Sequence, residues 1–237
     1  MTTTETIDRG SPDEWFRGLF LDEIAPLWRR ACVTDSGLFH PRLDRRWQRV
    51  GETVGTLRSQ ARLVFVFAAA WEHTDDERYR RTLEAGADFL LTHFRDTRRG
   101  GWFSACRADG TVVDRRKNAY DHTFLVFGLA HAGRVTDNAS LIQAAADAAD
   151  VLETRFRDDH GGLVWLADED FNDLDEGRSQ NPIMHFTEAL LALAEAEGNP
   201  ARVQQARRWI DFVFHSCARD QIPLPEDYDL AWRPTAA

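Results

Sequence analysis

The segment Arg178-Ser-Gln-Asn-Pro-Ile-Met-His-Phe-Thr-Glu-Ala-Leu-Leu-Ala-Leu193 combines a polar start with an apolar helical run. Asn181, His185 and Glu188 are four and three residues apart, so they share one face of a helix. The apolar run that follows is typical of a helix entering a core, where polar side chains are destabilising unless they bind something. A purely structural explanation is equally open: Asn181 caps the helix, Pro182 is its first residue, and His185 is a hydrogen-bonded, semi-buried histidine.

The same alternation of a buried and an amphipathic helix occurs twice upstream of this segment. The glycine pairs Gly100-Gly101 and Gly161-Gly162 lie 61 residues apart, and each precedes a short strand-like segment. A repeat of about 60 residues built from helix pairs predicts an all-α fold, an α/α toroid with short β-hairpins between helix pairs. The expected buried helices cover about 52–73, 120–134 and a segment from 185, and the amphipathic ones 77–94, 138–156 and 200–218, with a hairpin across Asp109-Gly110 and a strand over 163–166.

The N-terminal part of the chain supplies one more helix, which brings the expected number to about seven. Ser11-Pro12-Asp13-Glu14 has the residues of a capping box, with proline at the first helical position, so a helix is expected from there to about Ala31. Residues 34–50 are expected to form a long ordered loop. We expect the whole chain, residues 1–237, to form a single domain.

Composition excludes several classes of function. The 29 Lys and Arg residues are outnumbered by 39 Asp and Glu, for a net charge of −10, which disfavours nucleic acid as a partner. The longest apolar run, Leu63 to Trp71, is about half of what a membrane span requires. The start Met1-Thr-Thr-Thr-Glu-Thr-Ile-Asp8 lacks the pattern of a secretory signal, so a soluble, cytoplasmic protein is expected. The three cysteines have no disulfide or zinc-site spacing.

Aligning the helix pairs places the chemically interesting residues at one end of the toroid. Arg62, either His122 or Thr123, and His185 would lie near the starts of successive inner helices, around a cup with an apolar floor. Aromatic faces beside arginine and asparagine suit a sugar. The aromatic residues expected at the rim of this cup are Trp102, Tyr120 and Trp165.

Three segments, in order, resemble the N-acylglucosamine 2-epimerase family, which includes cellobiose 2-epimerases, mannose isomerases and sulfoquinovose isomerases. They are Arg62, Lys117-Asn-Ala-Tyr-Asp-His-Thr-Phe124 and Asn181-Pro-Ile-Met-His-Phe-Thr-Glu-Ala189. The last is the most specific and is most similar to the mannose isomerase branch. The resemblance runs from about residue 11 to the tail that ends near Trp232.

This resemblance implies an (α/α)6 barrel and proton transfer at carbon 2 of an open-chain aldose through a cis-enediol, without a metal or organic cofactor. His185 and Arg62 are the expected catalytic residues. Histidine suits proton transfer because its pKa lies near neutral pH, and a fixed arginine can stabilise the enediolate oxygen. The substrate, a monosaccharide or disaccharide, is expected to contact Tyr120, Asn181, Glu188, Trp102 and His122.

The chain also departs from the family pattern. Relatives often have glutamine in place of His122, and some have tryptophan one turn before the arginine, where this chain has Arg58. Seven helices are expected where a closed (α/α)6 ring has twelve, so the barrel should be incomplete. The absent helices would carry the C-terminal histidines that serve as acid and base in relatives.

Two other classes of function compete with an isomerase or epimerase. One is a non-catalytic carbohydrate-binding or assembly module on an open helical arc. The other is a glycosidase or polysaccharide lyase on the same toroid, with Asp121 and Glu188 as its acid pair, but this leaves the Asn-Pro-x-Met-His segment unexplained. The spacing of His185 and Glu188 also occurs in metal sites, but no second pair accompanies it, so no metal is expected.

An open arc should leave apolar residues exposed at its last inner helix. We expect Leu190 and Leu193 to be exposed there, and therefore expect self-association or pairing with a missing C-terminal half.

Overall fold

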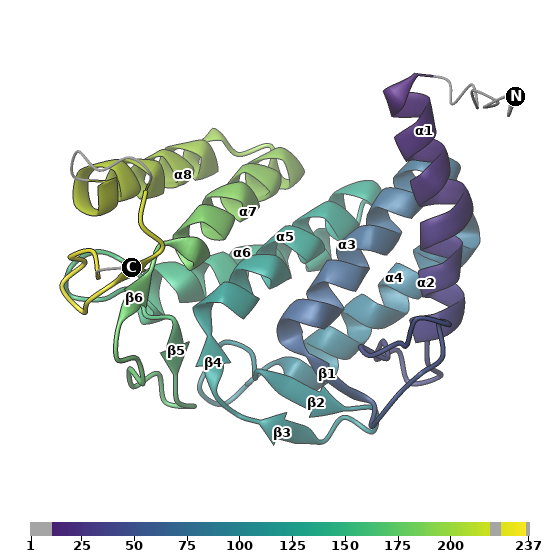
Figure 1. Ribbon diagram of the computed structural model, residues 1–237, viewed down its shortest axis with the longest axis horizontal. Coiled ribbons are helices and arrows are strands. Elements are labelled where there is room, and N and C mark those ends of the chain that lie inside the picture. Colours follow the sequence, from purple (N-terminus) through teal and green to yellow (C-terminus); the bar gives the residue numbers. More distant parts are fainter. Residues whose placement is uncertain (1–10, 219–223, 236–237) are drawn as a thin grey trace, which may run out of the picture.

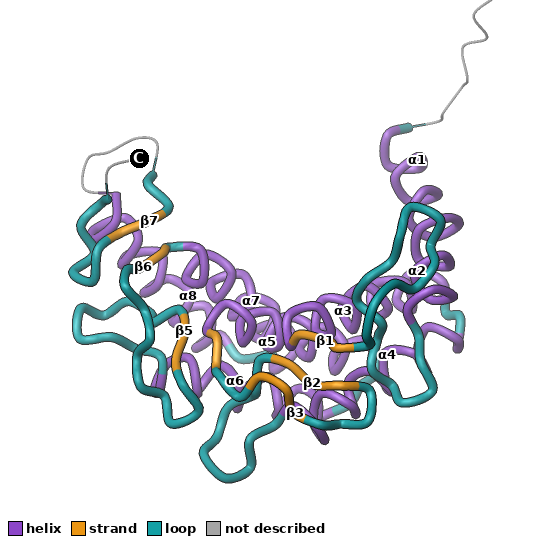
Figure 2. Tube along the Cα trace, turned by 60° about the horizontal axis from the view of Figure 1, so that its bottom comes forward, coloured by secondary structure: helices purple, strands orange, loops and turns teal. Residues whose placement is uncertain are grey.

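The chain folds into an open arc of helices, which Figures 1 and 2 show from two directions. The computed structural model describes residues 11–218 and 224–235, so the segment Met1–Asp8 discussed above lies outside the described residues. Within the described part the helices form seven continuous segments, as predicted. They are α1 (Pro12–Gly18), which continues through the π-helical turn Leu19–Ile24 into α2 (Ala25–Cys32); α3 (Leu57–Thr74); α4 (Glu77–Phe89), extended to Phe94; α5 (Ala119–Val135); α6 (Ala139–Arg155); α7 (Asn181–Glu197); and α8 (Pro200–Phe212), extended to Ala218.

The helices form two layers. The inner helices α3, α5 and α7 pack side by side, and each outer helix, α4, α6 or α8, packs on the inner helix that precedes it. The predicted arrangement, an incomplete α/α toroid with hairpins between helix pairs, is therefore confirmed. None of the helices within the described residues is long and apolar enough to cross a membrane.

Short strands precede all three inner helices. The strand β1 (Val54–Thr56) leads directly into α3, β4 (Lys117–Asn118) into α5, and β6 (Arg178–Ser179) lies two residues before α7. Each pairs antiparallel with a strand from another part of the chain: β1 with β2 (Ala105–Arg107), β4 with β5 (Leu166–Ala167), and β6 with β7 (Asp227–Tyr228). These pairings hold the N-terminal ends of the inner helices at the same end of the arc.

The predicted hairpin across Asp109-Gly110 is present. It joins β2 to β3 (Val112–Asp114), and Gly110 adopts the left-handed conformation at φ +85°, which glycine tolerates best. The capping box at Ser11 is also present, with reciprocal hydrogen bonds between Ser11 and Glu14.

Several predicted boundaries are wrong. The inner helix expected from about residue 52 begins at Leu57, because Val54–Thr56 pairs as a strand and Thr56 caps the helix. The strand expected over 163–166 is present only at Leu166–Ala167. The third inner helix begins at Asn181, one turn earlier than expected.

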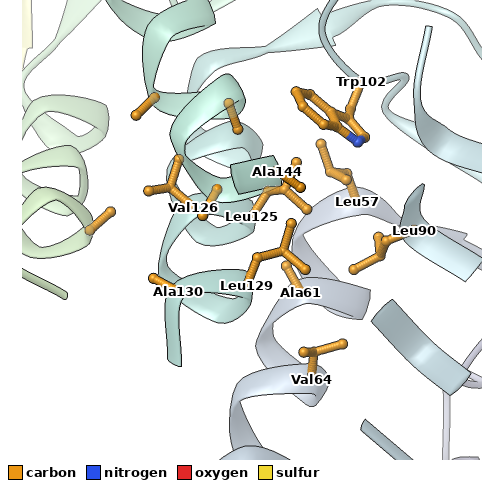
Figure 3. Close-up of a cluster of buried hydrophobic side chains, with 14 of the residues drawn as sticks. Leu57, Ala61, Val64, Leu90, Trp102, Leu125, Val126, Leu129, Ala130 and Ala144 are labelled. Atoms are coloured by element: carbon orange, nitrogen blue, oxygen red, sulfur yellow. The ribbon is translucent and has the colours of Figure 1, made fainter. Parts of the chain in front are cut away.

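The core lies between the inner and outer layers. Figure 3 shows its central part, where side chains of α3 and α5 interlock and Trp102 packs against them. Gly128 of α5 lies against α3 so closely that a Cβ atom there would be 2.5 Å from the carbonyl oxygen of Ala61. The absence of a side chain at Gly128 therefore permits the close approach of the two helices. The residues labelled in this core are Leu57, Ala61, Val64, Leu90, Trp102, Leu125, Val126, Leu129, Ala130 and Ala144.

A buried ion pair fixes the segment that enters α5. The Lys117 ammonium donates to the Asp96 carboxylate at 2.9 Å and to the Gly100 carbonyl oxygen at 2.5 Å, and both charged side chains are almost completely buried. A buried charge that loses its partner is strongly destabilising, because desolvation is then not compensated.

Lys117→Met should therefore lower the free energy of unfolding by about 3–5 kcal/mol, measured by urea denaturation. The matched control is Arg80→Met, which breaks a half-exposed pair with Glu84 and should lower the free energy of unfolding far less. Equal losses in the two variants would contradict the assigned role of the Lys117 pair.

His122 is also built into the core. Its Nε2 accepts the backbone N–H of Trp102 at 3.0 Å, and its Nδ1 lies 2.8 Å from the carbonyl oxygen of Asn118, to which it must donate because a carbonyl only accepts. The neutral ring therefore satisfies both neighbours. Burial lowers the pKa of His122 to about 4.

This lowered pKa predicts a loss of stability in acid. As the pH falls from about 6.5 to about 4, the unfolded chain binds a proton at this histidine that the folded chain does not, which removes roughly 3 kcal/mol. His122→Gln should remove this component, so urea unfolding between pH 7 and pH 4.5 should show a smaller decline than in the wild type. The exposed His160→Gln should keep the wild-type decline. An unchanged decline in His122→Gln would refute the assignment.

Candidate functional site

The three inner helices share one half-exposed face, opposite the outer helices. On α5 it is marked by side chains at four-, three- and four-residue intervals: Tyr120, Phe124, Phe127 and His131. Every other residue of α5 up to Gly133 is buried, so this stripe is what the helix presents to the inside of the arc. The corresponding part of α3 includes the exposed Arg62. The expectation that α3 is buried all round is therefore wrong, because the open arc leaves one face of it accessible.

Arg62 and His185 converge on the same ring. The guanidinium carbon of Arg62 lies 3.8 Å from the centroid of the Phe124 ring, and the His185 ring lies 4.7 Å from that centroid. The two residues are far apart in the sequence and belong to α3 and α7, on opposite sides of α5. The packing of three helices thus brings a cation and an imidazole to one site.

Tyr120 connects these groups. Its hydroxyl accepts a hydrogen bond from Arg62 at 3.3 Å, and its ring meets the His185 ring edge-on at 5.3 Å. The Trp165 ring stacks on it almost in parallel, with centroids 5.2 Å apart and an interplanar angle of 11°. The guanidinium carbon of Arg58, on α3, lies 5.2 Å from the centroid of the Tyr120 ring. Tyr120 is therefore held by contacts from three other segments.

His185 is paired with Glu188, as their spacing suggested. Nδ1 lies 2.6 Å from Oε2 of Glu188. An ionised carboxylate only accepts hydrogen bonds, so Nδ1 carries the hydrogen and Nε2 of the neutral ring has a free lone pair. This is the arrangement expected of a base oriented by a carboxylate.

Asn181 does not cap α7, so this part of the structural explanation is wrong, whereas its other part is confirmed: His185 is hydrogen-bonded and partly buried. The residue that precedes the helix is Gln180, and Asn181 is the first helical residue. The Asn181 amide donates weakly to Glu226, at 3.4 Å, while its buried Oδ1 has no hydrogen-bond partner. A buried acceptor without a partner is unusual in a folded protein.

Two expected site residues are not part of this surface. Trp102 is only 1% exposed and packs in the core beneath the helices (Figure 3), and His122 is completely buried. The placement of Trp102 on the rim is wrong because Trp102 pairs with Arg95 in a β-bridge and donates its backbone N–H to the buried His122, which places its side chain in the core. His122 follows Tyr120 by two residues, so it points to the opposite side of α5.

Three further residues neighbour this site: Arg58 and Phe124, which were not expected there, and Asp121, which was expected only as one acid of a glycosidase pair. Phe124 could have been found from its spacing of four residues from Tyr120. Arg58 is one turn before Arg62, and the Arg58 guanidinium lies 3.6 Å from Oδ1 of Asp121. Arg58 and Arg62 also line a cavity of about 360 Å³ with Trp28, so both cations are accessible.

Comparison with known proteins identifies the family. Residues 37–237 match the model of the N-acylglucosamine 2-epimerase family. The chain is 34% identical to a D-mannose isomerase of Thermobifida fusca over 64% of the chain and 37% of the relative, and 31% identical to one of Pseudomonas cannabina pv. alisalensis over 78% and 44%. It therefore spans less than half the length of these curated relatives.

The fold has close structural counterparts. A cellobiose 2-epimerase of Spirochaeta thermophila superimposes with a TM-score of 0.85 at 23% identity, over 93% of this chain and 57% of the other. A D-mannose isomerase gives 0.83 at 22% identity, over 93% and 58%. The arc is thus a part of an (α/α)6 barrel. Together with the match over residues 37–237, this places the chain in the N-acylglucosamine 2-epimerase family.

Proposed function

We propose that this chain forms part of a carbohydrate isomerase or epimerase that moves a proton at carbon 2 of an open-chain aldose. The observation that carries the proposal is the convergence of Arg62 and His185 on the Phe124 ring. Relatives named D-mannose isomerase and cellobiose 2-epimerase support the same class of reaction.

The geometry supplies the parts of an enolisation. The proton on carbon 2 is acidic because its electron pair can move to the neighbouring carbonyl. Nε2 of His185 is the available base, and Glu188 stabilises the imidazolium that forms. The electron pair then resides on the oxygen of carbon 1 as an enediolate, whose charge the Arg62 guanidinium can stabilise.

The fate of the proton decides the product. Return of a proton to the other face of carbon 2 gives the epimer, whereas delivery of a proton to carbon 1, together with transfer of the hydroxyl proton from O2 to O1, gives the ketose. We propose that the Tyr120 hydroxyl and the Asn181 amide hold sugar hydroxyls. We propose that helices beyond α8 supply the second proton carrier in a complete ring.

The alternative is a carbohydrate-binding module without catalysis. Such a module would keep the sugar contacts of the arc and lack the proton transfer.

Exchange in heavy water tests the proposal. The purified chain is incubated with mannose, glucose or cellobiose, and deuterium at carbon 2 is followed by NMR. Replacing His185 by Gln or Arg62 by Gln should slow the exchange about 100-fold, because each removes one proton-transfer or charge-stabilising group. The surface variant His160→Gln should exchange at the wild-type rate.

The outcomes separate the alternatives. Deuterium exchange that depends on His185 and Arg62 supports catalysis. Sugar binding without exchange favours the binding module. If the chain shows no sugar binding and no exchange, both functions are excluded for this chain alone.

We also propose that the edge formed by α7 and α8 is an association surface. The prediction that Leu190 and Leu193 are exposed there is wrong, because α5 and α8 pack on α7 and bury both completely. The exposed residues are instead Met184 and Leu191 of α7, together with three residues of α8 and its extension. Met184 and Leu191 lie two turns apart, and each is one turn from Glu188. The three residues of α8 and its extension are Val203, Ile210 and Phe214, and Phe214 is 67% exposed.

This surface predicts concentration-dependent self-association through a second copy of the chain. Leu191→Glu should raise the dissociation constant at least about tenfold, or 1.4 kcal/mol, measured by analytical ultracentrifugation. Leu174→Glu is the matched control, since Leu174 is exposed to the same extent (48% against 47%) but lies in the loop before β6. A wild-type chain that remains a monomer at all concentrations would contradict this proposal.

A further inference from the structure

Asp121 is a buried carboxyl group beside the candidate site. It is the third residue of α5, its side chain is only 8% exposed, and its Oδ1 has no hydrogen-bond partner. The charged groups that act on it are Arg58 and Arg62 of α3 and Asp114 of β3. Burial raises the pKa of Asp121 to about 6, against the opposing effect of the two arginines, so the carboxyl is ionised at neutral pH and above.

The two arginines differ in how they are engaged. Arg58 is the cation that pairs with Asp121, at 3.6 Å. Arg62 makes no ion pair within the described residues; it donates to the Tyr120 hydroxyl and lies over the Phe124 ring. Arg62 nevertheless lies close enough for its charge to act on Asp121. The buried carboxylate therefore has two possible partners and is paired with only one.

We propose that Arg58 and Asp121 are positioning residues of the site. Arg58 forms the ion pair with the buried Asp121 carboxylate, and this leaves the Arg62 guanidinium unpaired and available to the substrate. The inference rests on the proposed function only in assigning the substrate to Arg62. A buried carboxylate is stabilised by the nearest cation, and an arginine held in an ion pair is less able to stabilise a developing oxyanion.

This arrangement makes a specific prediction for Arg58→Gln. Without Arg58, ionised Asp121 should attract Arg62 and draw it away from Tyr120 and Phe124. The additional change Asp121→Asn removes the attraction and should release Arg62 again. A second mutation at a buried position would then restore what the first one lost, which a purely structural role would not produce.

The test measures Arg62 itself and needs no sugar. The full chain is treated with phenylglyoxal at pH 8, where Asp121 is ionised, and modification of Arg62 is followed by peptide mass spectrometry. Compared with the wild type, Arg58→Gln should slow this modification at least about threefold, and Arg58→Gln/Asp121→Asn should restore it. Arg30→Gln, on the exposed part of α2, is the matched control and should leave the rate unchanged.

Two results would overturn the inference: a wild-type rate at Arg62 in Arg58→Gln, or a slow rate that Asp121→Asn does not restore. Circular dichroism confirms that each variant is folded. Mannose affinity, measured in parallel by calorimetry, should fall in Arg58→Gln and recover in the double variant. If no variant binds a sugar, the proposed function fails, while the rate at Arg62 still decides the positioning role.

Discussion

The close contact between Ala61 and Gly128 sets the distance between α3 and α5, and the candidate site depends on it. Arg62 directly follows Ala61, and Phe124 is one turn before Gly128 on the same side of α5. Because the two backbones touch at this point, the guanidinium reaches the aromatic ring across the helix boundary. A larger residue at position 128 would separate the helices and with them the two halves of the site.

The sequence predicted the architecture because the repeat is expressed in several independent signals. The glycine pairs, the alternation of buried and amphipathic helices, the capping box at Ser11 and the Asp109-Gly110 turn all agree, and each depends on local physical chemistry. It also predicted that Arg62 and His185 meet, because both follow the short strands that lead into inner helices. Helix starts were less accurate, since strand pairing of Val54–Thr56 depends on residues about 50 positions away.

Side chains whose position depends on the path of a loop or on packing between helices could not be placed in this way. Trp102 looks like a rim residue because aromatic side chains are common at sugar sites, but the path of the loop after α4 buries it. His122 is adjacent to the site in sequence and is taken into the core by its hydrogen bonds to Trp102 and Asn118. Asp121 was noticed only as a possible acid, because its pairing with Arg58 follows from the packing of α3 against α5.

The local character of the packing has a consequence for folding. Each inner helix packs mainly on its inner neighbours along the arc and on the outer helices beside it, so stability is close to a sum of nearest-neighbour interfaces. An arc of this kind does not require ring closure to acquire structure. It can acquire structure one helix pair at a time, starting at any of its interfaces.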